Sequence, residues 1–236
     1  MSEAPYLPDL LLRRVEAAAG RPKRVRTRLA LLAAAAAEMA EVGYEAMTVE
    51  GVVRRAGLAR GTFYLYFRNR GDAAIAVRRA FGATLRILRP RGMGRLPPWN
   101  AIWQVNRLYV AFYARNARIA AGVELLARER PEILASRDRI NQRWAQVLLR
   151  DLLRRRPNMA ADDRRRTLLS LRYVIMMADE ALRQSFADPP EKLRTLVVSE
   201  DEVTDILTRL WYRGVYAEDP PEAYHTVPES YGSITG

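Results

Sequence analysis

Apolar positions recur at helical spacing along most of the chain, and no stretch alternates as a half-buried strand would. Leu29, Leu32, Ala36 and Met39, for example, fall on one face of an alanine-rich segment. With its glycine and proline breaks, the pattern predicts an all-α fold of about nine helices. They are an alanine-rich helix ending at Gly43, followed by helices at about 49–56, 60–67, 69–89, 99–115, 117–129, 132–156, 163–187 and 199–217.

Breaks in this pattern divide the chain. Residues 1–20 form a leader with a helical pattern, which Gly20 and Pro22 end. Three prolines and two glycines make 90–98 the clearest interruption. The tail 219–236 is rich in Pro, Ser, Gly and Tyr, so we expect it to be extended or disordered.

The charge distribution narrows the function. The net charge of +12 favours a polyanionic partner, nucleic acid or an anionic membrane surface. Residues 21–70 hold ten Lys and Arg against four Asp and Glu, a net charge of +6 in fifty residues, whereas residues 71–236 together carry +7. Cysteine is absent and there is one histidine, so we expect neither a metal site nor a cofactor. The longest uncharged apolar stretch, nine residues, is too short to span a membrane, and we expect a cytoplasmic protein.

Three short helices between 21 and 67 have the spacing of a helix-turn-helix. Gly57 can take the positive φ that the turn requires. In the following helix Phe63 and Phe67 are expected to face the core. The opposite face is then free to meet DNA, where arginine can bind guanine and hydroxyls can bind phosphate. Its residues are Arg60, Thr62, Tyr64 and Tyr66.

This segment resembles the helix-turn-helix of the TetR (tetracycline-repressor-like) family of transcriptional regulators. The resemblance covers about residues 24–72 and is carried by Ala56-Gly57, Gly61-Thr62-Phe63-Tyr64, Tyr66-Phe67 and Asn69. It implies a DNA-binding domain at 21–72 and a larger helical domain at 73–218 that binds a ligand and dimerises. The implied partners are a palindromic double-stranded operator, a second copy of the chain and an unidentified small-molecule effector. The residues predicted to contact DNA are Arg26, Arg28, Thr48, Arg60, Gly61, Thr62, Tyr64, Tyr66 and Arg70.

Three positions depart from the family's common pattern. Ala59 stands where a Ser or Thr often caps the recognition helix, which costs about 1 kcal/mol of local stability. Gly51 replaces a common acidic residue, so Thr48 has no capping-box partner. Arg70 replaces the usual lysine and keeps its charge, so a phosphate contact at the start of that helix is still expected.

The larger domain offers two sets of candidates. Large apolar and hydroxyl-bearing side chains are expected to surround an effector pocket, with a filled core as the alternative. These are Trp103, Tyr109, Phe112, Trp144, Tyr173 and Met177. Apolar stripes on the last two long helices are predicted to form a four-helix dimer interface. These are Leu171, Ile175, Ala178, Leu182, Ile206, Leu207, Leu210 and Trp211.

The sequence therefore predicts a DNA-binding transcriptional regulator, a repressor that a small-molecule ligand releases from its operator. A regulator or accessory factor without an effector is the first alternative. A basic helical protein of the membrane surface is less favoured, because the buried side of the first helix is mostly alanine. An enzyme is not expected, since no Ser/His/Asp set, metal cluster or phosphate-binding glycine loop is apparent.

Overall fold

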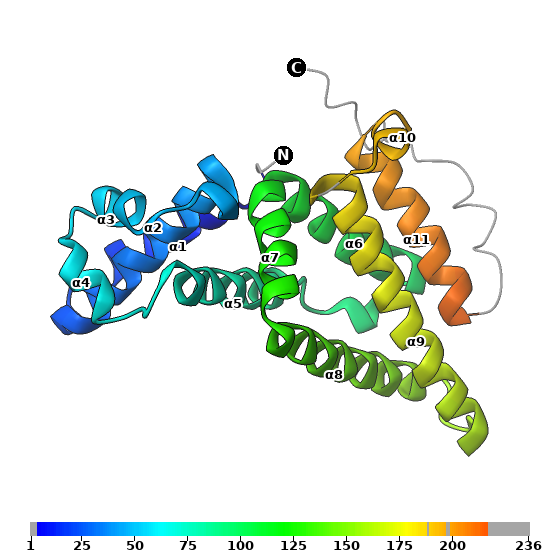
Figure 1. Ribbon diagram of the computed structural model, residues 1–236. Coiled ribbons are helices and arrows are strands. Elements are labelled where there is room, and N and C mark those ends of the chain that lie inside the picture. Colours follow the sequence, from blue (N-terminus) through cyan, green and yellow to red (C-terminus); the bar gives the residue numbers. More distant parts are fainter. Residues whose placement is uncertain (1–3, 188, 197–198, 217–236) are drawn as a thin grey trace.

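The computed structural model describes residues 4–187, 189–196 and 199–216, and within these ranges the chain is all helical (Figure 1). The helices are α1 (Leu7–Ala17), α2 (Lys23–Ala46), α3 (Val49–Ala56), α4 (Arg60–Tyr64), α5 (Arg70–Leu88), α6 (Pro98–Arg115), α7 (Ala117–Glu129), α8 (Pro131–Arg155), α9 (Ala161–Leu182), α10 (Glu191–Arg194) and α11 (Glu200–Tyr216). A 3-10 turn, Met93–Arg95, precedes α6, and a π-helical turn, Arg183–Ala187, extends α9.

The predicted fold class is confirmed, and the number of helices is higher than predicted. The described residues contain eleven α-helices because the leader folds as α1 and the short α10 follows the proline pair at 189–190. The alanine-rich helix breaks at Gly43 as expected, where φ is +81°, and one further turn continues to Ala46. The predicted tail, 219–236, lies outside the described residues.

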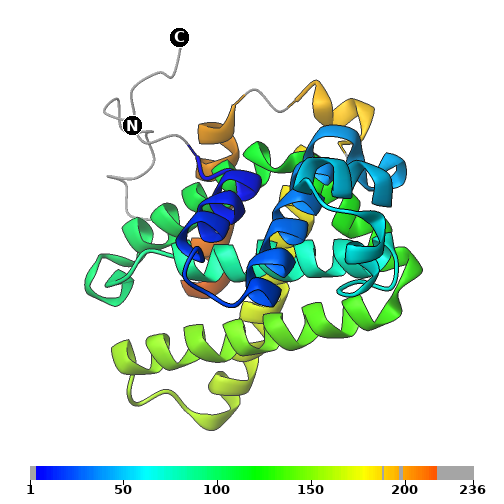
Figure 2. The same cartoon turned by 90° about the vertical axis from the view of Figure 1, so that its left-hand side faces the viewer.

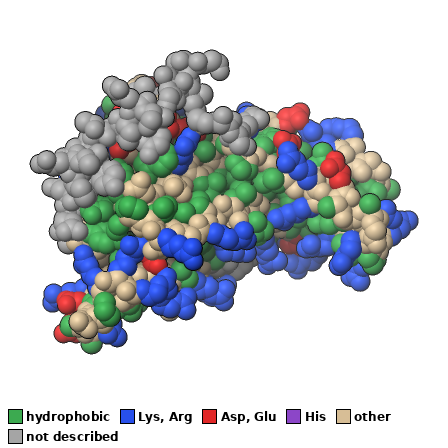
Figure 3. All heavy atoms as spheres, turned by 180° about the vertical axis from the view of Figure 1, so that it is seen from behind, with side chains coloured by type: hydrophobic (Ala, Val, Ile, Leu, Met, Phe, Trp, Pro, Cys, Tyr) green, Lys and Arg blue, Asp and Glu red, His purple; other side chains and the backbone are tan. Residues whose placement is uncertain are grey.

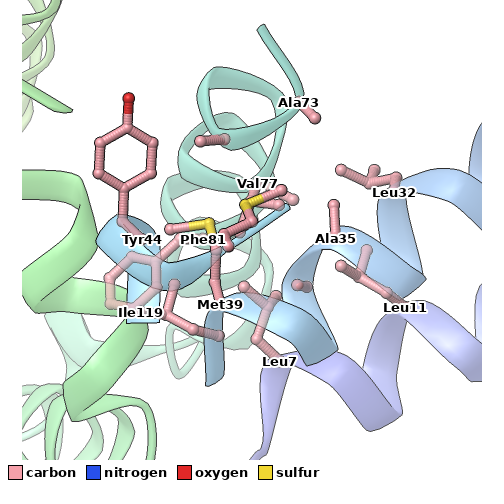
Figure 4. Close-up of a cluster of buried hydrophobic side chains, with 14 of the residues drawn as sticks. Leu7, Leu11, Leu32, Ala35, Met39, Tyr44, Ala73, Val77, Phe81 and Ile119 are labelled. Atoms are coloured by element: carbon pink, nitrogen blue, oxygen red, sulfur yellow. The ribbon is translucent and has the colours of Figure 1, made fainter. Parts of the chain in front are cut away.

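Helices α1 to α4 form one end of the molecule, and α5 runs from this end into the helices that follow (Figure 1). The end-on view shows α1 lying alongside α2 (Figure 2). Side chains from α1, α2, α5 and α7 meet in one core at this junction (Figure 4). Leu7, Met39, Val77 and Ile119 are fully buried there, so the two ends of the molecule share a continuous apolar interior.

Two close contacts fix α7 and α1 on this core. Gly122 of α7 lies so near Met39 and Tyr44 that a Cβ would come within 2.9 Å of each. Asn116, buried between α6 and α7, accepts a hydrogen bond from the Leu7 backbone N–H (2.8 Å) and donates to the Pro5 carbonyl (3.0 Å). The leader is therefore part of the folded junction and is hydrogen-bonded to the larger helical region.

The larger region consists of α6 to α11 with the second half of α5. Its buried side chains form two smaller clusters, one around Val110 and Leu207 and the other around Ala145 and Leu171, with Trp211 packed against both. None of the described helices has the length and apolar character needed to cross a membrane.

Candidate functional site

The turn between α3 and α4 has the geometry that its sequence predicts. Thr48 caps α3, because its hydroxyl oxygen accepts a hydrogen bond from the Gly51 N–H at 2.9 Å. Gly57 ends α3 in the left-handed conformation, with φ +63°, and Leu58 N–H donates to the Val53 carbonyl at 3.0 Å. These bonds fix the direction in which α4 leaves α3.

Helix α4 is anchored by Phe63 and Phe67, which are buried with ring centroids 5.5 Å apart. Tyr64 points outward with 45% of its surface exposed, whereas Thr62 and Tyr66 are half-buried. No heavy atom lies within 4 Å of a Cβ placed on Gly61. One side of α4 is thus held by the core and the other offers polar groups to a partner.

Arg60 lies on this exposed side but already has protein partners. Its guanidinium forms an ion pair with Glu50 of α3 and donates to the Tyr64 hydroxyl at 3.3 Å. Both members of the ion pair are more than half exposed, so water screens it and a base or phosphate can displace Glu50. The contact with Tyr64 holds the arginine against α4.

The basic segment before the helix-turn-helix is helical. Arg26 and Arg28 are exposed on the first turns of α2, and the Arg28 guanidinium lies 5.9 Å from the Phe67 ring centroid. Seen from behind, basic side chains gather at the end of the molecule that carries α1 to α4 and along one edge of the larger region (Figure 3). The positive charge near α4 is therefore carried by a rigid element.

Arg70 has a role within the protein that the sequence did not indicate. Its Nη1 donates to the carbonyls of Glu45 (2.6 Å), Met47 (3.1 Å) and Tyr44 (3.3 Å), at the end of α2. Its guanidinium also lies over the Tyr44 ring, 5.2 Å from the centroid. A phosphate contact would have to use the other nitrogens, and it stays a prediction.

An ion pair between the buried Glu38 and the partly exposed Arg55 of α3 was not predicted. Glu38 is 4% exposed and accepts from Arg55 Nε at 2.5 Å, while Arg55 Nη2 donates to Glu41 at 2.6 Å. The hydrogen bonds that Arg55 donates to these two carboxylates raise its pKa. Gly51 packs directly on Glu38, and a Cβ there would overlap the carboxylate. Glycine therefore stands at position 51, in place of an acidic residue, because a side chain there would not fit. In the sequence, the sign of this ion pair was Glu38, a glutamate that follows a run of alanines.

The larger region encloses a cavity of about 260 Å³ between α5, α6, α7, α8, α9 and α11, called the central cavity below. Phe81, Ile102, Val105, Leu148 and Ile175 are among its apolar walls. Of the six side chains predicted to line a pocket, Tyr109 and Trp144 do so.

The other four predicted pocket residues do not line the central cavity. Phe112 is packed in the core against Phe81, Tyr173 is 61% exposed, and Trp103 and Met177 are half-buried. Aromatic composition identified the helices around the cavity, but it could not identify which face of each helix turns inward.

Several titratable groups line the central cavity. Burial raises the pKa of Tyr109 to about 12 and also raises the pKa of Tyr113. Burial raises the pKa of the Asp179 carboxyl, which accepts a hydrogen bond from Asn141 at 3.1 Å. Burial lowers the pKa of Arg89, which stacks on Trp144 with its guanidinium 4.2 Å from the ring centroid. The cavity wall is therefore mostly apolar, with a few polar groups that can orient a ligand.

Comparison with protein families identifies the family that the helix-turn-helix resembles. The family "Bacterial regulatory proteins, tetR family" matches residues 31–77, from the middle of α2 through α3 and α4 into α5. These residues are a TetR-family DNA-binding domain. A comparison with curated protein sequences found no match.

Solved structures extend the likeness to the rest of the fold. The fatty acid degradation regulator FadR from Bacillus halodurans is 18% identical with a TM-score of 0.57, over 78% of this chain and 93% of that one. FadR from Bacillus subtilis, crystallised with stearoyl-CoA, is 19% identical with a TM-score of 0.56, over 79% and 98%. MexZ, a repressor from Pseudomonas aeruginosa, is 17% identical with a TM-score of 0.54, over 86% and 99%. At these identities, the likeness establishes a TetR-like fold.

Behind the TetR-family domain, the predicted dimer residues fall into two groups. Five are at most 9% exposed and pack inside the single chain, so they have little surface to offer a second copy. These are Leu171, Ile175, Ala178, Leu182 and Leu207. Ile206 and Leu210 of α11 are 50% and 42% exposed, and Trp211 is half-buried. The sequence had not selected the exposed apolar side chains of α9, which are Leu169, Tyr173 and Met176.

Proposed function

We propose that this protein is a homodimeric transcriptional regulator that represses genes from a palindromic operator and is released by a small-molecule effector. The observation that carries the proposal is the outward face of α4, a recognition helix of TetR type whose polar side is open. We assign 21–72 to DNA binding and 73–218 to effector binding and dimerisation, with α5 shared between them.

In this proposal α4 enters the major groove. Arg60 leaves its ion pair with Glu50 and forms hydrogen bonds to a base edge instead. The remaining contacts position the domain on the phosphate backbone. Their candidates are Arg26, Arg28, Thr48, Gly61, Thr62, Tyr64, Tyr66 and Arg70.

The proposed dimer uses α9 and α11. Exposed Leu169, Tyr173 and Met176 on α9 and Ile206 and Leu210 on α11 give each helix an apolar face that the described residues leave uncovered. Such a face is what a two-fold four-helix interface needs. Two recognition helices would then meet successive major grooves of a palindrome.

The central cavity is the proposed effector site. Phe81 and Leu85 of α5 and Arg89, which directly follows that helix, line the cavity, and α5 begins at the end of the helix-turn-helix. Val123 and Glu124 of α7 also line it, while Gly122 packs against α2. A ligand can therefore act on both helices that hold the DNA-binding domain, provided that it binds one domain spacing better than the other. The stearoyl-CoA complex of Bacillus subtilis FadR supports the capacity of a protein with this fold to hold a ligand.

Selection of duplexes from a random pool, followed by titration with the full-length protein, tests the proposal. We expect a palindromic site to bind at least a thousandfold more tightly than scrambled DNA. Equal affinity for both sequences would contradict a sequence-specific regulator. Sedimentation at micromolar concentration checks the dimer.

Salt titration on the selected site tests the phosphate contacts. Arg26→Ala and Arg28→Ala should each reduce the slope of log affinity against log salt by about 0.9 if the side chain neutralises one phosphate. Arg70→Ala should do the same if its free nitrogens reach DNA. An unchanged slope with lower stability would limit Arg70 to holding the end of α2.

A further inference from the structure

The charged side chains around the central cavity are not balanced. Six arginines and three carboxylates line it, and they are Arg78, Arg86, Arg89, Arg137, Arg155, Arg183, Glu124, Asp151 and Asp179. Because the walls between these groups are apolar and partly shielded from water, an uncompensated charge there costs more than at the surface. The sign of a cavity charge that lacks a partner therefore indicates the opposite charge that a ligand would have to carry.

Two of the three carboxylates of the cavity are paired with arginines, and the third is hydrogen-bonded to an amide. Glu124 pairs with Arg137 at 2.5 Å, and Asp151 pairs with Arg154 at 2.5 Å and with Arg155 at 3.6 Å. Asp179 accepts a hydrogen bond from Asn141 and lies in the field of Arg137. A cationic ligand would thus find two carboxylates already paired with arginines, and the third, Asp179, hydrogen-bonded to an amide.

Arg89 is different. It ends α5 at the cavity wall and stacks on Trp144, and within the described parts of the chain it makes no hydrogen bond or ion pair with a carboxylate. Its nearest acidic neighbour in electrostatic terms is Asp151, whose oxygens are already shared by two other arginines. Stacking fixes the guanidinium plane and leaves its edge available for a bidentate acceptor.

A second buried donor lies on the same cavity. Trp211 is one of its lining residues, and the indole N–H of Trp211 is buried without an acceptor among the described residues. A buried donor left unsatisfied is unfavourable, and an acceptor on a ligand would relieve that cost. Arg89 and the Trp211 indole are both donors, so a ligand that binds them needs hydrogen-bond acceptors such as oxygen atoms.

We propose that the central cavity binds an amphipathic organic anion, whose negatively charged group is held by Arg89 against the face of Trp144. The apolar part of the molecule lies among Phe81, Ile102, Val105, Leu148 and Ile175. Two kinds of amphipathic anion have this combination of a negative group and an apolar chain: one with a free carboxylate, and one with a larger phosphate-bearing headgroup on an acyl chain. This inference rests on the proposed effector function of the cavity and adds the class of ligand.

Isothermal titration of the full-length protein with four probes tests the class. The probes are decanoate, decanoyl-CoA, methyl decanoate and decylammonium. We expect at least one of the two anions to bind tenfold or more tightly than the neutral ester, and decylammonium to bind no better than the ester. Binding of decanoate assigns the carboxylate as the recognised group, whereas binding of decanoyl-CoA alone assigns the phosphate-bearing headgroup.

Arg89→Met should weaken binding of the preferred anion about tenfold and leave the affinity for methyl decanoate unchanged. Arg79→Met is the matched control, an exposed arginine on α5 that does not line the cavity. Trp211→Phe should weaken binding of the anion a few-fold, since it removes the indole N–H together with part of the ring.

Three results would overturn the proposal: equal affinity for the ester and both anions, equal loss of all probes in Arg89→Met, or no binding of any probe at millimolar concentration. DNA binding by the same ligand-free preparation is measured in parallel. If one of these results is found and the protein still binds DNA, only the proposed ligand class is refuted. If the protein does not bind DNA, the proposed function itself is refuted.

Discussion

The two regions of this molecule treat buried polar groups in opposite ways. In the DNA-binding region one continuous core joins α1 to α5 and α7, and its buried carboxylate, Glu38, is matched by Arg55 and by the space that Gly51 leaves. In the larger region two separate clusters border a cavity, and on its wall, among the described residues, Arg89 has no ion pair and the Trp211 indole N–H has no acceptor. A closed, fully paired interior holds a fixed shape for reading DNA, whereas an open, unpaired one is suited to taking up a ligand.

The largest effect is expected where the larger region meets its second copy. Leu210→Glu places a charge on the exposed apolar face of α11 and should yield monomers. Since two linked half-site contacts reinforce each other, operator affinity should fall about 100-fold or more. Sedimentation and DNA titration measure both effects. Leu12→Glu, on the exposed face of α1, is the control and should stay dimeric; a dimeric Leu210→Glu would place the interface elsewhere.

The paired interior of the DNA-binding region can be broken at Arg55. Arg55→Met leaves the Glu38 carboxylate buried without its partner, and the free energy of unfolding should fall by about 2–3 kcal/mol, less than for a fully buried pair because Arg55 is 27% exposed. Urea denaturation measures the loss. The double variant Glu38→Gln with Arg55→Met should recover part of it. Arg54→Met, an exposed neighbour, is the control, and an equal loss there would refute a special role for the pair.

The reading face of the same region is tested at Arg60. Arg60→Ala should weaken binding to the selected operator by about 1–3 kcal/mol and relax the preference at one base pair. Glu50→Gln should instead tighten binding a few-fold, because the competing carboxylate is removed. Anisotropy titrations against single-base variants measure both effects. A loss of the same size on scrambled DNA would make Arg60 a phosphate contact.

Sequence patterns anticipated the DNA-binding region better than the larger one, for a physical reason. Gly57, Phe63 and Phe67 act within a few residues of one another, so the turn and the buried side of α4 could be predicted locally. The central cavity depends on how six helices pack, and spacing alone does not determine that arrangement. On α9, Leu171 and Ile175 share the same helical spacing as Leu169 and Tyr173, yet one stripe is buried and the other exposed.

The remaining prediction concerns a buried carboxyl of the larger region, Asp179. Burial raises its pKa, so the folded state binds this proton more tightly than the unfolded state does. The carboxyl therefore favours folding below its ordinary pKa, and that contribution is lost as the pH rises through the raised value.

Asp179→Asn keeps the size of the side chain and an oxygen acceptor for Asn141, but it carries no charge. We expect this variant to be more stable than the parent at pH 7 by about 1 kcal/mol, the low end of what replacing a buried charge can give. The difference should shrink towards zero below about pH 4, where the parent is protonated as well. Urea denaturation at both pH values and one protein concentration measures it, with the exposed Glu16→Gln as control. If Asp179→Asn were instead less stable than the parent at pH 7, the carboxylate would be a net stabilising partner of Arg137 and Asn141, and the larger region would be as well paired as the DNA-binding one.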